Sequence, residues 1–206
     1  LEFSRVRGLP MGGFNEIRLI RELLESGYAV IAPRATLRVG WVTNLPLPDY
    51  QKTSDYHMFT ELLRRIDRGG FGPLNKQRLY AVGISSGGYN TSRLAITFPG
   101  RFRAIAIQSA SYASCLGPLC RMPEAIPREH PPTLFLHGER DLIVRMSTAQ
   151  EFDSYLRERN IETRFVTDPD MGHGWLDVAP VEVVGCADRT SFLASRRSFS
   201  RPRYPV

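Results

Sequence analysis

Short apolar runs alternate with amphipathic segments along most of the chain, and this alternation limits the fold more than any other feature of the sequence. The runs are continuously apolar, which is typical of strands that are buried on both faces of a sheet. The segments between them repeat their apolar residues at helical spacing. Strands and helices in this order predict βαβ units, a mostly parallel sheet and helices on both of its faces. We therefore expect a three-layer α/β fold with at least five strands.

The expected elements follow one another in chain order. Strands are predicted at residues 28–32, 79–82, 104–107, 133–136 and 163–166. Helices are predicted at residues 17–24 (ended by Gly27), 55–67, 86–98 and 147–159. In the last helix, Ser147 and Gln150 have the spacing of a capping box. Two long connections, residues 34–54 and 109–131, leave strand ends, and we expect them to be binding loops or lids.

Size and composition place the chain among globular proteins with a single folded unit. It has 206 residues, of which 42% are hydrophobic and 23% charged, and this balance argues against a disordered chain. No apolar run reaches the roughly 18 residues of a membrane-spanning helix, so we expect no membrane partner. We predict one domain over residues 1–186 and an irregular tail, rich in Arg and Ser, over residues 187–206.

The net charge is +6, but its distribution does not indicate a nucleic-acid partner. The predicted tail holds five Arg and one acidic residue, so most of the excess charge lies there and the rest of the chain is nearly neutral. A nucleic-acid surface needs basic residues clustered on the folded part of a protein. The sequence shows no such cluster, and we expect no nucleic-acid partner.

Three cysteines, Cys115, Cys120 and Cys186, cannot all pair within one chain. Cys115 and Cys120 close a short loop, where a disulfide and two separate thiols are equal alternatives. A disulfide would indicate a secreted or periplasmic protein, and thiols would fit a cytoplasmic one. No His lies close to these cysteines in the sequence, so a zinc site is not expected. We expect neither a metal nor an organic cofactor.

The residues Gly83, Ile84, Ser85, Ser86 and Gly87 form a G-x-S-x-G motif between a predicted strand and a predicted helix. In this context a sharp turn lifts the serine hydroxyl above the sheet, and glycines stand where side chains would not fit. Ser85 is therefore the candidate nucleophile. The N–H of Ser86, at the start of the helix, would face a developing oxyanion. The alternative is a Gly/Ser turn with no catalytic role.

A nucleophilic serine needs a base, and the base needs a carboxylate that orients it. Two later strands are followed by such residues: Asp141 comes after the strand at 133–136, and His173 after the strand at 163–166. The chain order Ser, Asp, His is known from one hydrolase fold. We expect Asp141 to orient His173, and His173 to be the base for Ser85.

Other titratable residues compete for these roles. Glu139 is a second candidate acid, close to Asp141 in sequence. Asp168 and Asp170 precede His173 and are expected to shape its loop. The remaining histidines are expected to be structural or peripheral: a hydrogen-bonded His137 at a strand end, and His57 and His130 on the surface or in loops.

The chain resembles the α/β-hydrolase superfamily at these residues. YAVIAP, YAVGISSGGY, FLHGERDLIV and MGHGW are similar to successive motifs of that superfamily. GYAVIAP, GWVTN and MGHGW are most similar to its esterase and polyester-depolymerase-like branch, also called dienelactone-hydrolase-like. The resemblance covers about residues 10–178. It implies Ser85 as the nucleophile, His173 as general base and then acid, and Asp141 as the orienting carboxylate.

The chain departs from this superfamily at both ends of the resemblance. Members usually have a strand ending in His-Gly before the first helix, and the loop after it supplies the second oxyanion donor. Here only residues 1–6 remain for that strand, so we expect either a truncated chain or a sheet that is shortened at the N-terminus. The backbone N–H of Met11 or Gly12 is the expected second donor. The exposed sheet edge could pair with another copy of the chain. No closing helix is recognisable after His173.

Four aromatic residues near these motifs are candidates for substrate contact: Trp41, Tyr89, Tyr112 and Trp175. For Trp41 and Trp175, plain packing is an equal alternative. Their character fits an uncharged acyl or aryl ester, small or polymeric, and the resemblance implies a serine carboxylesterase. Residues 85–89 also resemble prolyl-oligopeptidase-type peptidases, and the incomplete N-terminal sheet leaves a non-catalytic binding protein as a third alternative.

Overall fold

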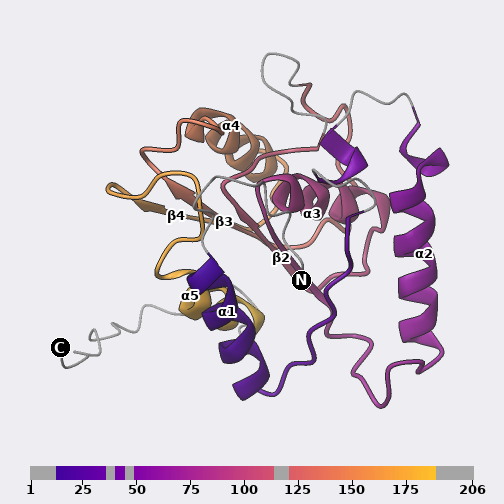
Figure 1. Cartoon of the computed structure of the whole chain (residues 1–206). Coiled ribbons are helices and arrows are strands. Elements are labelled where there is room, and N and C mark those ends of the chain that lie inside the picture. The colour runs from indigo at the N-terminus through magenta and orange to yellow at the C-terminus, as the bar shows by residue number, and fades with distance from the viewer. Residues whose placement is uncertain (1–12, 36–39, 45–48, 114–120, 189–206) are drawn as a thin grey trace.

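The computed structural model describes residues 13–35, 40–44, 49–113 and 121–188. Its described strands form one parallel sheet in the order β1-β2-β3-β4 (Figure 1). These strands are β1 (Tyr80–Ile84), β2 (Ala104–Gln108), β3 (Thr133–Gly138) and β4 (Thr163–Asp168). Each matches a predicted strand, and the parallel pairing confirms the expected βαβ architecture.

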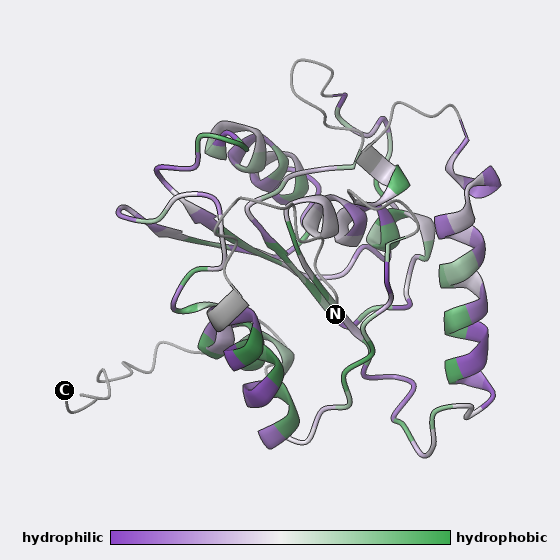
Figure 2. Ribbon diagram, in the orientation of Figure 1, coloured by the Kyte–Doolittle hydropathy of each residue, from purple (hydrophilic) through white to green (hydrophobic). Residues whose placement is uncertain are grey.

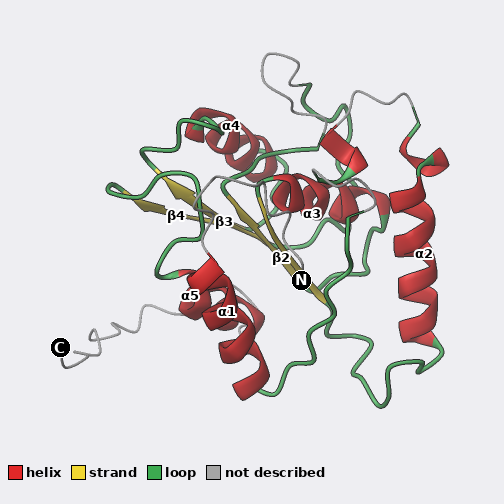
Figure 3. Ribbon diagram, in the orientation of Figure 1, coloured by secondary structure: helices red, strands yellow, loops and turns green. Residues whose placement is uncertain are grey.

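Helices cover both faces of this sheet (Figure 3). The helices are α1 (Gly13–Glu25), α2 (Ser54–Asp67), α3 (Ser86–Thr97), α4 (Met146–Arg157) and α5 (Ala179–Asp188). Short 3-10 turns at Val42–Asn44 and Tyr50–Lys52 lie in the connection before α2. The three-layer α/β arrangement predicted from the sequence is confirmed.

The alternation of β2 side chains explains why its sequence is continuously apolar. Ala104 and Ala106 pack against α1 and α5 on one face of the sheet. Ile105 and Ile107 pack against α3 and α4 on the other face. Both faces of the strand are therefore buried, and no position is left for a polar side chain in contact with water.

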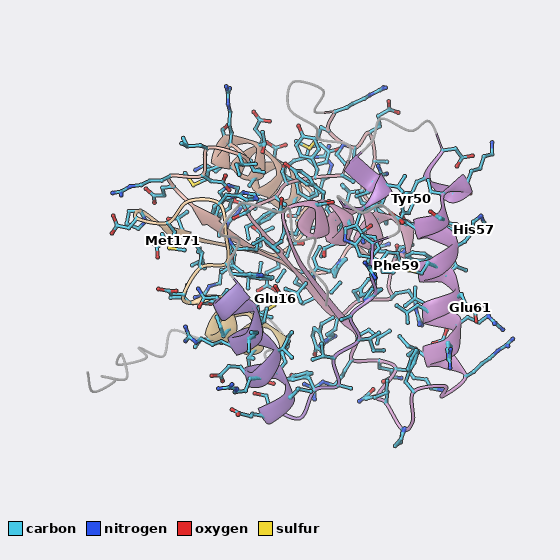
Figure 4. The ribbon with its side chains drawn as sticks, in the orientation of Figure 1. Glu16, Tyr50, His57, Phe59, Glu61 and Met171 are labelled. Carbon is cyan, nitrogen blue, oxygen red and sulfur yellow. The ribbon has the colours of Figure 1, made fainter. Side chains whose placement is uncertain are left out.

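Helix α2 shows how an amphipathic pattern is anchored. Thr53 caps its N-terminus by accepting a hydrogen bond from the Tyr56 N–H. Phe59 is buried against Trp41 and Leu94. In Figure 4, His57 and Glu61 point away from the sheet, on the opposite side of α2 from Phe59. His57 is therefore a surface residue, as expected.

The predicted capping box of α4 is wrong. The helix begins one residue earlier than expected, at Met146, and its N-cap residue is Arg145, which makes no side-chain capping hydrogen bond. Ser147 therefore lies inside the first turn. The Thr148 hydroxyl instead donates to the Arg145 carbonyl at 2.9 Å.

The predicted strand at residues 28–32 is also wrong, because this segment is not a strand in the structure. Its residues are half-buried or exposed, and it runs as an extended connection after α1, where Figure 2 shows its apolar character. The side chains of Tyr28 and Val30 pack against the core. The described part of the sheet thus has four strands, not the expected five or more.

A closing helix is present after His173, contrary to expectation. Helix α5 buries Val183, Cys186 and Ala187 on one side, and Figure 1 shows it lying beside α1. The exposed side of α5 also carries an apolar residue, Val181. The helix therefore lacks the clear polar face by which a surface helix is recognised in a sequence.

Candidate active site

The Ser85 turn joins the end of β1 to the start of α3. Ser85 has φ 52° and ψ −123°, a conformation that is rare for a residue with a side chain. A Cβ atom at Gly83 would lie only 2.2 Å from the Gly87 carbonyl oxygen, so glycine is required there. The Ser85 N–H donates to the Gln108 carbonyl at 2.9 Å and ties the turn to β2. This strained strand–turn–helix geometry is the one that the sequence motif predicts for a candidate nucleophile.

Asp141 and His173 form a hydrogen-bonded pair near this turn. Asp141 follows β3, His173 follows β4, and Nδ1 of His173 lies 2.8 Å from Oδ2 of Asp141. Both side chains are almost fully buried, at 0% and 5% exposure. The other carboxylate oxygen of Asp141 accepts the N–H groups of Ile143 and Val144 at 2.9 and 2.8 Å. The carboxylate is therefore held by its own loop while it binds the imidazole.

The surroundings of Asp141 keep it ionised. Burial by itself would raise its pKa, but hydrogen bonds from His137, His173 and the Val144 N–H outweigh burial and hold the pKa far below its usual range. His137 Nε2 lies 2.9 Å from the Val144 carbonyl and 3.4 Å from Asp141 Oδ2. Because a carbonyl only accepts, this nitrogen carries a proton. His137 is thus the buried, hydrogen-bonded residue that the sequence predicted.

The competing acids are occupied elsewhere. Glu139 is exposed and accepts a hydrogen bond from the Thr167 hydroxyl at 2.8 Å. Asp168 accepts from the Asp170 N–H, and Asp170 pairs with Arg140. These contacts shape the loop before His173, as expected, and leave Asp141 as the carboxylate that contacts the imidazole.

The structure does not bring all predicted site residues into contact. Among the hydrogen bonds of the described residues, none joins Ser85 Oγ to His173. Ser86 opens α3, so its N–H lies at a helix N-terminus, where backbone donors face a site for negative charge. Met11 and Gly12, the candidates for the second oxyanion donor, lie outside the described residues, as do Cys115 and Cys120.

All four aromatic candidates for substrate contact are buried. Trp41 packs against Phe59 with ring centroids 5.2 Å apart. Tyr112 packs edge-on against Phe152, and burial, followed by the charge of Asp141, raises the pKa of Tyr89 to about 12. Trp175 lies in the core between the sheet and α5. Their contact with a substrate stays a prediction.

His130 lies in a loop, which is one of the two expected alternatives, and it is buried there. Its Nδ1 lies 2.9 Å from the Pro131 carbonyl and must donate to it. Nε2 has no hydrogen-bond partner among the described residues. Burial is the main reason that the His130 pKa falls to about 4.

Sequence analysis missed the contacts that hold the backbone of residues 40–44 against the Ser85 turn. The Trp41 N–H donates to the Ser86 hydroxyl at 2.8 Å, and the Val42 N–H donates to the buried carboxylate of Asp55 at 2.6 Å. A Cβ at Gly40 would lie 2.4 Å from the Ser86 hydroxyl oxygen. No local pattern marks Asp55, because it lies within an ordinary amphipathic helix.

Sequence analysis also missed Gln108 and Ser109, two fully buried polar residues at the end of β2. Their side chains reach the loop that carries His173.

Within the described ranges, no cluster of His, Cys, Asp or Glu is placed to hold a metal ion. No helix in that part of the chain is long and apolar enough to cross a membrane.

Known structures share this fold. The structure is similar to that of esterase PE8, with a TM-score of 0.59, 19% identity and 85% of each chain covered. It is similar to Arabidopsis thaliana SOBER1, with a TM-score of 0.51, 20% identity, and 66% of this chain and 64% of that chain covered. It is also similar to the Bacillus cereus carboxylesterase, with a TM-score of 0.54 and 12% identity, and the match covers 65% of this chain and 59% of that chain. The chain therefore has the α/β-hydrolase fold.

A sequence relative points to a particular branch of the superfamily. The chain is 49% identical over 185 residues to a poly(3-hydroxyoctanoate) depolymerase of Pseudomonas fluorescens. The match covers 89% of this chain and 66% of that protein, so the chain spans slightly less than two thirds of its relative. No protein-family model matches the sequence. The chain is thus similar to the esterase and polyester-depolymerase-like branch that its motifs resemble.

Proposed function

We propose that the chain is a serine hydrolase that cleaves carboxylic esters through an acyl-enzyme on Ser85. The observation that carries this proposal is the 2.8 Å distance between His173 Nδ1 and the buried carboxylate of Asp141. The two residues lie on the loops that follow β4 and β3. The name of the relative, a polyester depolymerase, supports an ester as the bond that is cleaved.

The pairing assigns a role to each group. Because Asp141 accepts the Nδ1–H, Nε2 of His173 is the nitrogen that can take a proton. Ser85 Oγ attacks the ester carbonyl carbon while its proton passes to Nε2, and the Ser86 N–H stabilises the oxyanion. The same proton then goes to the departing alcohol. Water, deprotonated by Nε2, finally releases the acid and restores Ser85.

The proposed substrate is an uncharged ester with a short to medium acyl or aryl group. A polyester with such side chains is included, because the relative is named for one. The aromatic residues expected to contact the substrate favour an apolar acyl or aryl group over an ionic one.

The test measures hydrolysis of p-nitrophenyl esters from acetate to octanoate, and of a poly(3-hydroxyoctanoate) suspension, by the folded protein. We expect turnover that falls by at least about 10³-fold in Ser85→Ala, because the nucleophile is removed. Ser154→Ala, an exposed serine on α4, is the matched control and should retain full activity.

Two outcomes would favour the alternatives. Faster cleavage of aminoacyl arylamides than of aryl esters would indicate a peptidase. If the folded protein turned over no ester, or if Ser85→Ala kept full activity, a binding protein or a different site would replace this proposal.

A further inference from the structure

The end of β2 contacts both the nucleophile turn and the loop of the base. The Gln108 carbonyl accepts the Ser85 N–H at 2.9 Å. The side-chain oxygen of the same residue accepts the Leu176 N–H at 3.3 Å, three residues after His173. One residue thus bonds to the backbone of Ser85 and to the segment that carries His173.

Ser109 adds a second contact to the same loop. Its hydroxyl donates to the Gly174 carbonyl at 3.1 Å and receives the Gly174 N–H at 3.5 Å. It also accepts a hydrogen bond from the Gln108 side-chain amide at 3.0 Å. A hydroxyl has one donor and two acceptor sites, so its capacity is filled. Gly174 directly follows His173, and the contact therefore lies next to the base.

Because Gln108 and Ser109 are buried, the stability of this region depends on their hydrogen bonds. Gln108 and Ser109 are both 0% exposed, and Ser109 has φ 47°, a region that residues with side chains seldom occupy. Burial of an amide and a hydroxyl costs free energy that only their hydrogen bonds offset. Apart from the bond between the two side chains, all the side-chain hydrogen bonds described above go to the His173 loop.

We propose that Gln108 and Ser109 are positioning residues that hold the His173 loop in a fixed place relative to the Ser85 turn. The inference rests on the proposed function for its kinetic consequences. Catalysis by a serine and a histidine depends on their separation, and a displacement of about 1 Å can reduce the rate about 10²-fold. The pair would act on the rate of the chemical step rather than on substrate binding.

The first test compares Ser109→Ala with Ser111→Ala in the full chain. Ser111 is a matched control, because it is equally buried and its hydroxyl also donates to a backbone carbonyl, that of Thr148 at 2.7 Å. We expect Ser109→Ala to lower kcat for p-nitrophenyl butyrate tenfold or more, with KM within twofold of the wild type. Ser111→Ala should retain kcat within twofold, with a similar loss of thermal stability.

A second variant, Gln108→Glu, gives a signature in the pH profile. A neutral Glu side chain has a carbonyl acceptor for the Leu176 N–H and an O–H donor for Ser109, which is the hydrogen-bonding pattern of Gln. The ionised form has no donor. We expect the ratio of variant to wild-type kcat to be near one at the acidic end of the activity range and to fall at least fivefold as the pH rises.

A third readout does not need catalysis. Amide hydrogen exchange at Gly174 and Leu176 should accelerate in Ser109→Ala and not in Ser111→Ala. Equal kcat in the two serine variants, or a constant activity ratio in Gln108→Glu, would overturn the positioning role. A wild-type protein that turns over no ester would instead overturn the proposed function, and unchanged exchange at Gly174 and Leu176 would then overturn this inference separately.

Discussion

Two stretches of five residues, 28–32 and 104–108, the first apolar throughout and the second apolar up to Gln108, have different structures in this molecule. Residues 104–108 form β2, which pairs with β1 on one side and β3 on the other and is buried at every position. Residues 28–32 form no strand and lie half-buried beside a cavity of about 530 Å³. The cavity is lined by Val30 and Ile31 of this segment and by Tyr80 and Val82 of β1.

The difference shows what an apolar run needs in order to become a strand. Backbone N–H and C=O groups must find partners, and a strand obtains them only from neighbouring strands. Segment 28–32 gains side-chain contacts through Tyr28 and Val30 but no ladder. The candidate site depends on paired strands, because Asp141 and His173 are carried by loops that follow β3 and β4, which pair with each other.

The largest expected effect is the loss of activity in Asp141→Asn, on the loop after β3. The side-chain oxygen of Asn can still accept the N–H groups of Ile143 and Val144, which leaves its NH₂ group facing His173 Nδ1. The imidazole would then carry its proton on Nε2 and could not act as a base. We expect kcat for p-nitrophenyl butyrate to fall about 10³–10⁴-fold.

The matched control for that variant is Asp67→Asn, an exposed carboxylate on α2 paired with Arg101. It should retain activity within twofold. A loss of less than tenfold in Asp141→Asn would show that another group orients His173.

The next prediction compares the loss of stability that an Ile→Ala substitution causes in each of the two stretches. Ile107→Ala removes a side chain that is 0% exposed, between α3 and α4. We expect its free energy of unfolding to fall by about 3–4 kcal/mol. Ile31→Ala acts on a half-buried side chain that already borders a cavity, and should cost about 1 kcal/mol or less. Urea denaturation measures both, and equal losses would contradict the comparison.

A smaller effect concerns His130, in the connection between β2 and β3. Its pKa is about 4 in the folded protein, mainly because of burial, and near 6.5 when unfolded. Between these values the unfolded chain binds a proton that the folded protein does not, so stability falls as the pH falls. From pH 7.5 to 4.5 this group should cost about 2.5 kcal/mol.

Two variants separate this contribution from that of the carboxylates. His130→Asn keeps a donor for the Pro131 carbonyl and removes the titrating ring, so its stability should decline less over this pH range. His57→Asn, at an exposed position, should follow the wild type. A decline in His130→Asn as steep as in the wild type would refute the assignment.

The sequence predicts the paired part of the fold well, because local pattern and tertiary environment agree there. Strands β1 to β4 and helices α2, α3 and α4 lie within a few residues of their expected positions. The pairing of Asp141 with His173 agrees with the order of residues after successive strands. These features depend on periodicity and on a motif with a strict backbone requirement, which are both local.

The remaining features depend on contacts between distant residues. Segment 28–32 has the pattern of a strand but pairs with none of the described strands. Helix α5 packs beside α1, a contact that no local pattern indicates. Gln108 and Ser109 have no distinctive spacing, and the hydrogen bonds from their side chains to the His173 loop join residues more than 60 positions apart. No periodicity can indicate such contacts before the fold brings the residues together.

The most direct test of the catalytic assignment is fluorophosphonate labelling of the folded protein, followed by intact mass and peptide mapping. An activated serine reacts with this reagent, whereas an ordinary surface serine does not. We predict a single adduct, located on Ser85 and absent from Ser85→Ala and His173→Ala. An adduct on another serine, or an unlabelled Ser85 in protein whose fold is verified by circular dichroism, would contradict the assignment of Ser85 and His173.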